Sequence, residues 1–178
     1  MRYNTLFLDR DGVINRKIEN GYVTKIEEFE FLPNVITALE FLSNKFQYIF
    51  IVTNQQGIGK GIFSLSDLTK IHNYMLDEIN RRGGRIDKIY IAPHLESENH
   101  VNRKPQPGMA WQAKNDFPDV DFKRSIMVGD SMLDMQFGEN AGMTTVFLTN
   151  NESNTQVVAD LICNDLYDFA MNGLNNFA

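Results

Sequence analysis

The sequence predicts one α/β domain over residues 1–178, with helices covering both faces of a doubly wound parallel sheet. Short apolar runs alternate along the chain with segments of helical periodicity, and strands that alternate with helices pair in parallel. The run Tyr48–Val52 is apolar throughout, which is typical of a strand buried on both faces. A chain of 178 residues is long enough to bury most of the apolar surface of such a domain.

Three strands and two helices are expected in the first half of the chain. Pro33 opens the first helix, in which apolar residues recur at spacings of three and four from Val35. A glycine-rich loop, Asn54–Phe63, precedes the second helix, and Ser64 and Asp67 have the spacing of a capping box at its start. The expected elements are the strands Thr5–Leu8, Tyr48–Val52 and Ile86–Ala92, and the helices Val35–Leu42 and Ser64–Arg82.

The second half begins with the polar loop Pro93–Pro107, whose prolines disfavour regular structure. Gly142 is expected to end a helix, because glycine adopts the left-handed conformation found there at little cost. The expected elements are the helices Gly108–Asn115, Met132–Asn140 and Asp165–Met171, and the strands Ser125–Val128, Thr144–Leu148 and Asp160–Cys163.

Charge and cysteine content limit the classes of partner. The formal net charge of −6 provides no general attraction for nucleic acid or anionic lipid. Cys163 is the single cysteine, so no disulfide forms within the chain, which suits a reducing compartment. There is no apolar signal segment and no run long enough to span a membrane. We expect a cytoplasmic monomer that binds a small molecule.

Polar clusters follow four of the expected strands. In a parallel sheet the carboxyl ends of these strands share one edge, where ligands bind. The clusters are Asp9 and Asp11; Thr53, Asn54 and Gln55; Arg103 and Lys104; and Gly129, Asp130 and Asp134. These groups suit phosphoryl transfer through a covalent intermediate.

Asp9 is the expected nucleophile, and Asp11 the acid that protonates the leaving oxygen and then deprotonates water. Mg²⁺ prefers oxygen ligands, which Asp9, Asp130 and the backbone carbonyl of Asp11 could supply. The Thr53 hydroxyl and the Asn54 backbone N–H would hold phosphoryl oxygens. Lys104 would stabilise the transition state, and Asp134 would orient Lys104 or metal-bound water.

These motifs, in this order, resemble the haloacid dehalogenase-like phosphohydrolases: Asp9-x-Asp11-Gly12, then Thr53, then Lys104, then Gly129-Asp130-x-x-x-Asp134. The resemblance implies a Rossmann-like sheet. The segments between successive motifs are already filled by a helix and a strand each, so no large cap domain is expected.

Longer blocks are similar to the D,D-heptose 1,7-bisphosphate phosphatases, among them Gly21-Tyr22-Val23, Thr53-Asn54-Gln55-Gln56-Gly57-Ile58 and Arg103-Lys104-Pro105. This implies Mg²⁺-dependent removal of the 7-phosphate from a seven-carbon sugar bisphosphate, a precursor of lipopolysaccharide or other glycans. Arg103 would then hold the retained anomeric phosphate, while the segments containing Tyr22 and Gln55 would border the sugar.

Many relatives bind zinc in the loop before the Arg-Lys pair, and here the sequence departs from the family. The corresponding positions are Ala92, His94, His100 and Asn102, without a cysteine. A structural zinc site usually includes thiolates, so no tight zinc site is expected.

Three other functions remain open. Histidinol-phosphatases share several blocks, but their substrate has no second phosphate for Arg103. A polynucleotide 3′-phosphatase shares the Thr53–Ile58 element. However, the net negative charge of this chain disfavours binding of a nucleic acid. A silent phosphosugar-binding protein would not need the complete set of catalytic residues. His72, on a helical pattern, is expected to be structural rather than catalytic.

Overall fold

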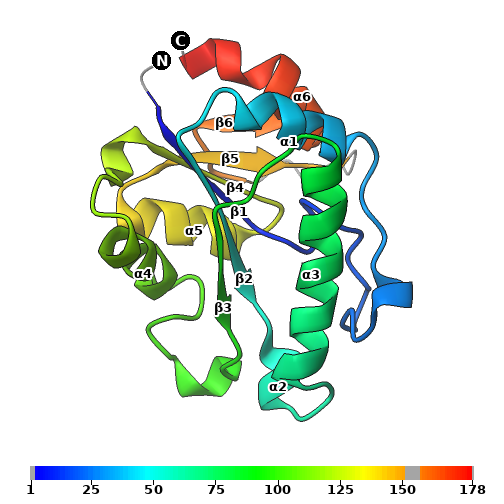
Figure 1. Ribbon diagram of the computed structural model, residues 1–178. Coiled ribbons are helices and arrows are strands. Elements are labelled where there is room, and N and C mark those ends of the chain that lie inside the picture. Colours follow the sequence, from blue (N-terminus) through cyan, green and yellow to red (C-terminus); the bar gives the residue numbers. More distant parts are fainter. Residues whose placement is uncertain (1–2, 151–156, 178) are drawn as a thin grey trace.

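The computed structural model describes residues 3–150 and 157–177, which form a parallel sheet of six strands with helices on both faces (Figure 1). The strand order is β3-β2-β1-β4-β5-β6. This order has a switch point between β1 and β4, from which the chain winds outward in both directions. The strands are β1 (Thr5–Leu8), β2 (Tyr48–Asn54), β3 (Lys88–Ala92), β4 (Ser125–Gly129), β5 (Thr144–Leu148) and β6 (Leu161–Cys163).

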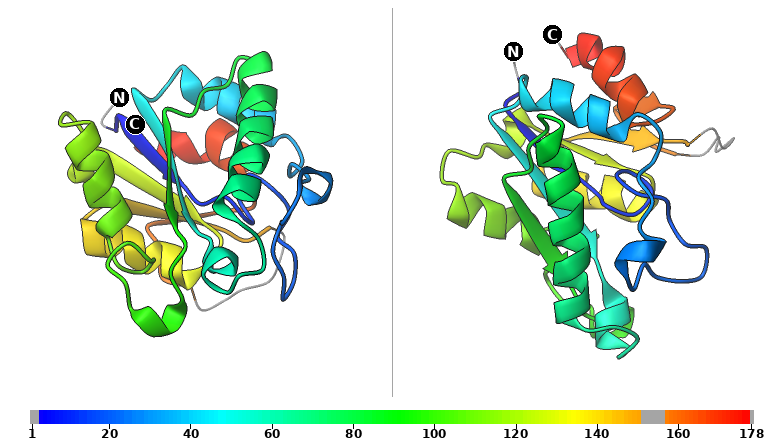
Figure 2. Two further views of the ribbon diagram at one scale, coloured as in Figure 1. Left: turned by 60° about the horizontal axis from the view of Figure 1, so that its bottom comes forward. Right: turned by 45° about the vertical axis from the view of Figure 1, so that its right-hand side comes forward.

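The helices divide between the two faces of the sheet (Figure 2). One face is covered by α1 (Val35–Ser43), α3 (Leu65–Arg81) and α6 (Leu166–Met171), and the other by α4 (Gly108–Asp116) and α5 (Met132–Ala141). The short helix α2 (Gln56–Gly59) follows β2. The 3₁₀ helices are η1 (Ile26–Glu28), η2 (Glu96–Glu98), η3 (Phe122–Arg124) and η4 (Gly173–Phe177).

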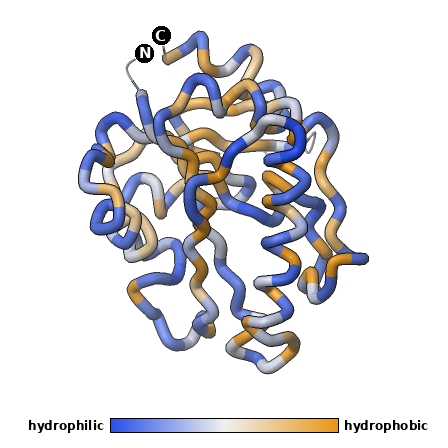
Figure 3. Tube along the Cα trace, in the orientation of Figure 1, coloured by the Kyte–Doolittle hydropathy of each residue, from blue (hydrophilic) through white to orange (hydrophobic). Residues whose placement is uncertain are grey.

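The alternation of side chains along β1 produces two separate cores. Leu6 and Leu8 pack on the α1 side, whereas Phe7 packs on the α4 and α5 side against Phe50. The central strands are accordingly hydrophobic, and the surrounding loops are more polar (Figure 3). In the described parts of the chain, none of the helices combines the length and the hydropathy needed to cross a bilayer.

The structure confirms the predicted doubly wound sheet and its strands. β1 and β5 have the expected bounds, while β2 extends to Asn54 and β3 begins at Lys88. No large cap is inserted within residues 3–150 and 157–177. The segment between β1 and α1 instead runs alongside α3 (Figure 2). Within this segment, η1 contacts α3.

The prediction of a glycine-rich loop over Asn54–Phe63 was wrong in two places, because β2 continues to Asn54 and α2 lies within the segment. Gly57 permits this turn to pack closely: a Cβ there would lie 2.4 Å from Cε1 of Phe63 and 3.0 Å from Cγ of Tyr22. The helix therefore depends on tertiary packing that helical periodicity could not predict in so short a segment.

Ser64→Ala should lower the free energy of unfolding by about 1 kcal/mol, because it removes the N-cap of α3. Ser64 Oγ accepts a hydrogen bond from the Asp67 N–H at 3.1 Å, and Asp67 Oδ2 accepts one from the Ser64 N–H at 3.1 Å. Urea unfolding would measure the change, with Ser66→Ala in the same helical turn as the control. Equal stability of the two variants would contradict the capping role.

Candidate active site

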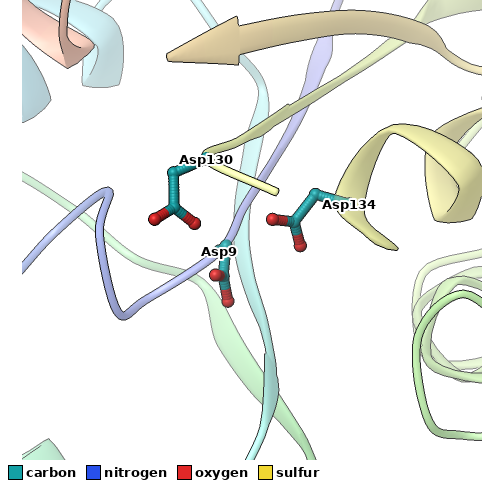
Figure 4. A group of neighbouring side chains, drawn as sticks. All are labelled: Asp9, Asp130 and Asp134. Carbon is teal, nitrogen blue, oxygen red and sulfur yellow. The ribbon is translucent and has the colours of Figure 1, made fainter. Parts of the chain in front are cut away.

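Three carboxylates converge at the switch point of the sheet (Figure 4). Asp9 directly follows β1, Asp130 directly follows β4, and Asp134 lies in the first turn of α5. One oxygen from each lies within 4.8 Å of the others. The edge predicted to bear the site therefore does bring these residues together.

Lys104 lies between Asp9 and Asp134 and is only 3% exposed. Its Nζ donates to Asp9 Oδ1 at 2.7 Å, to Asp134 Oδ1 at 2.6 Å and to the carbonyl of Val52 at 2.9 Å. Burial opposes the charged form, but the carboxylates of Asp134 and Asp9 outweigh it and raise the pKa of Lys104. Lys104 is therefore a permanent cation beside the expected nucleophile.

Asn54 fixes the position of Lys104. The Asn54 side chain accepts from the Lys104 backbone N–H at 3.0 Å and donates to the Lys104 carbonyl at 3.2 Å. A single amide at the end of β2 thus satisfies both backbone groups of a residue in an irregular loop. The predicted phosphate contact of the Asn54 backbone N–H stays a prediction.

Both side-chain oxygens of Asp134 are occupied by protein donors. Oδ1 accepts from Lys104, and Oδ2 accepts from the Ser131 N–H at 3.1 Å and from its hydroxyl at 2.6 Å, completing the capping box of α5. Gly129 allows this close approach, since a Cβ there would lie 2.2 Å from Cβ of Asp134. This geometry favours a positioning role for Asp134 over direct metal ligation.

Asp9 and Asp130 fit a divalent cation. Oδ1 of Asp130 is buried and has no hydrogen-bond partner among the described residues. Burial, and then the charge of Asp134, raise the pKa of Asp9 to about 8, and burial raises the pKa of Asp130 to about 6. A cation bound between them would favour both ionised forms. Oxygen ligands of this kind suit Mg²⁺.

Gly12 supports the same arrangement. Its φ is +92°, and a Cβ at this position would lie 2.0 Å from Oδ2 of Asp130. Any other residue would therefore be strained and would displace a proposed metal ligand.

Asp11 is held by three donors. Arg10 Nη2 donates to its two oxygens at 2.8 and 3.0 Å, Asn15 Nδ2 to Oδ1 at 2.9 Å, and Gln55 Nε2 to Oδ2 at 3.0 Å. Burial alone would raise the pKa of Asp11, but Arg10 and the other donors lower it overall. The predictions assigned no role to Arg10 or Asn15, although Arg10 lies directly between the two aspartates in the sequence.

A cavity of about 250 Å³ opens in front of these groups. Asp9, Asp11 and Lys104 line it together with Tyr22 and Arg103. The Tyr22 hydroxyl accepts from Lys60 Nζ at 3.0 Å, and Arg103 Nη1 donates to the His94 carbonyl at 3.4 Å.

Two predicted contact residues have their side chains engaged within the protein. Thr53 is fully buried, and its Oγ1 accepts from Gln55 Nε2 at 2.9 Å. The same Gln55 amide donates to Asp11, so Gln55 links Thr53 to the acid–base group. The predicted contacts of Thr53 with phosphate and of Gln55 with the sugar stay predictions. The observed role of both side chains is to hold each other and Asp11 in place.

The loop that would hold zinc in relatives is organised differently. The rings of His94 and His100 stack with centroids 3.4 Å apart. His94 Nδ1 lies 3.3 Å from Glu98 Oε2, and His100 Nδ1 accepts from the Asn102 N–H at 3.2 Å. The expectation that this loop binds no zinc tightly stays a prediction.

Comparisons with known proteins agree with the site. Residues 101–169 match the family model described as HAD-hydrolase-like. The chain is 45% identical over 152 residues to the D-glycero-α-D-manno-heptose-1,7-bisphosphate 7-phosphatase of Campylobacter jejuni, covering 85% of this chain and 86% of that protein. It is 36% identical over 169 residues to the phosphatase of the same name from Mycobacterium tuberculosis, covering 93% and 89%.

Solved structures give the same result. The crystal structure of a D,D-heptose 1,7-bisphosphate phosphatase from B. bronchiseptica, complexed with magnesium and phosphate, matches with a TM-score of 0.87 at 28% identity. The match covers 97% of this chain and 99% of that structure. The chain therefore belongs to the D-glycero-D-manno-heptose-1,7-bisphosphate 7-phosphatase family of haloacid dehalogenase-like hydrolases.

Proposed function

We propose that this enzyme is a Mg²⁺-dependent phosphatase that removes the 7-phosphate of D-glycero-D-manno-heptose 1,7-bisphosphate. The observation that carries the proposal is that Asp9, Asp11 and Lys104 line one cavity, with Asp130 beside Asp9. The 45% identity to a phosphatase named for this substrate supports the choice of sugar.

Asp9 attacks the 7-phosphorus through a side-chain oxygen and forms an aspartyl-phosphate, while the bond to the sugar oxygen breaks. Lys104 holds Asp9 in place and stabilises the charge that develops on the phosphoryl oxygens. Mg²⁺, held by Asp9, Asp130 and the carbonyl of Asp11, would reduce the repulsion between the anionic nucleophile and the anionic substrate.

Asp11 transfers the protons of both half-reactions. It donates one to the leaving sugar oxygen and then takes one from the water that hydrolyses the intermediate. The lowered pKa of Asp11 favours its ionised form in the free enzyme. An incoming phosphate dianion favours the protonated form by like-charge repulsion, so substrate binding prepares Asp11 for the first step.

Arg103 and Tyr22 lie at the cavity, at positions suited to the rest of the substrate. The Arg103 guanidinium would bind the retained anomeric phosphate, and Tyr22 would border the sugar. We place the reaction in the cytoplasm, in the synthesis of heptose precursors of lipopolysaccharide or other glycans, with the enzyme acting as a monomer.

The enzyme should prefer the heptose bisphosphate over histidinol phosphate by several hundredfold in kcat/KM, roughly 3.5 kcal/mol. The reason is that histidinol phosphate leaves Arg103 without a second phosphate. Phosphate release with Mg²⁺ would be measured for both anomers of the bisphosphate and for histidinol phosphate. A preference for histidinol phosphate would assign the enzyme to that substrate instead.

Asp9→Asn should abolish turnover, by about 10⁴-fold or more in kcat, while substrate binding is retained. An amide cannot form the acyl-phosphate, but it preserves the shape of the site. Phosphate release and binding calorimetry would be measured for this variant and for Asp77→Asn, an exposed position on α3. Turnover of Asp9→Asn at the rate of the control would exclude Asp9 as the nucleophile.

Arg103→Ala should raise KM for the bisphosphate by about 10–100-fold, as expected for losing one charge-assisted contact worth 1.5–3 kcal/mol. Its kcat should change far less, because Lys104 rather than Arg103 lies at the scissile phosphate. Steady-state kinetics would be compared with those of Arg82→Ala, an exposed position after α3. An unchanged KM would remove Arg103 from the phosphate site.

A further inference from the structure

We propose that His72 is a positioning residue for the acid–base step, acting on Asp11 through Arg10. His72 lies on α3, remote in sequence from the catalytic motifs, and is 8% exposed. Its Nε2 lies 3.1 Å from Arg10 Nη1, and Arg10 Nη2 donates to both oxygens of Asp11. The proposal rests on the phosphatase function proposed above.

The direction of the His72 contact follows from the chemistry of Arg10. A guanidinium offers only donors, so His72 Nε2 accepts the hydrogen bond and the ring is neutral, with its proton on Nδ1. Burial, followed by the charge of Arg10, also lowers the pKa of His72 to about 3. His72 therefore acts as a fixed acceptor at neutral pH and not as a proton carrier.

Arg10 needs such an acceptor to hold its orientation. It is 1% exposed, and its Nε has no hydrogen-bond partner among the residues that the structure describes. Asp11 contacts the guanidinium through Nη2 alone, which leaves the plane of the group free to turn about that contact. The contact between Nη1 and His72 provides the second fixed point.

Loss of the His72 contact would change the orientation of the Asp11 carboxyl but would not remove the carboxyl from the site. Without an acceptor, Nη1 would be a buried donor lacking a partner, and Arg10 would turn toward another one. Asn15 and Gln55 would still hold Asp11, so the carboxyl would be misdirected rather than released. Asp11 would then approach the leaving oxygen less often in the geometry that transfers its proton.

The need for this proton depends on the leaving group. When a sugar phosphate reacts, the bond from Asp9 to phosphorus forms, the bond to the sugar oxygen breaks, and the Asp11 proton moves to that oxygen. A p-nitrophenolate leaves as a stable anion and needs no proton from Asp11. A defect in positioning Asp11 should therefore slow formation of the aspartyl-phosphate from the sugar phosphate and hardly slow its formation from p-nitrophenyl phosphate. Hydrolysis of the intermediate, in which Asp11 takes a proton from water, is common to both substrates.

The test uses His72→Phe, which removes the acceptor but keeps a ring, and His72→Gln, whose amide oxygen can accept from Arg10. We expect His72→Phe to lower kcat/KM for the heptose bisphosphate about tenfold, with kcat/KM for p-nitrophenyl phosphate within about twofold of wild type. This ratio reports the steps up to release of the leaving group and is not affected by hydrolysis of the shared intermediate. His72→Gln should recover most of the lost kcat/KM for the heptose bisphosphate. Melting temperatures would be measured for both variants.

Two results would overturn the inference. An equal loss with both substrates, or no loss in either variant, would leave His72 with a purely structural role. If wild-type enzyme with Mg²⁺ hydrolyses neither substrate, the proposed function fails and the inference falls with it. An active wild type therefore separates failure of this inference from failure of the function.

Discussion

The buried ammonium group of Lys104 is the interaction on which the site depends. Three acceptors surround it: the carboxylates of Asp9 and Asp134 and the carbonyl of Val52. Removing one partner of a buried ion pair typically costs about 3–5 kcal/mol, because the other charge is left uncompensated. Here two carboxylates would face each other without a cation between them. The same group thus compensates the buried carboxylates and, in the proposed mechanism, would stabilise the transition state.

The surrounding contacts fix the positions of the Lys104 cation and of the carboxylates that bind it. Asn54 fixes the backbone of Lys104, and Ser131 occupies the second oxygen of Asp134. Glycines at positions 12 and 129 leave room for Asp130 and Asp134 where any Cβ would collide. Both oxygens of Asp134 are engaged by protein donors, whereas Oδ1 of Asp130 has no partner among the described residues. This difference supports the proposal that Asp130, with Asp9, holds the metal.

The sequence was sufficient for the sheet and for placing the carboxylates of Asp9 and Asp130 at the same edge of it, because both depend on local patterns. Apolar runs mark the strands, and Asp9 and Asp130 each come directly after one. The contacts that organise the site were not predictable in this way. Arg10 and His72 are 62 positions apart, and their pairing depends on how α3 packs in the tertiary structure. The short helix α2 likewise depends on the close packing of Gly57 against Phe63.

The strand order also has a consequence for how the enzyme is made. β3, β2 and β1 are all complete within the first 92 residues, whereas β4, the other neighbour of β1, spans residues 125–129. While the chain is being synthesised, Asp9 and Asp11 therefore end a strand with one edge unpaired, before Lys104, Asp130 and Asp134 have been added. The proposed site is complete only when β4 and the start of α5 have closed this edge. Under the proposed function, the appearance of activity would therefore report that the second half of the sheet has joined the first.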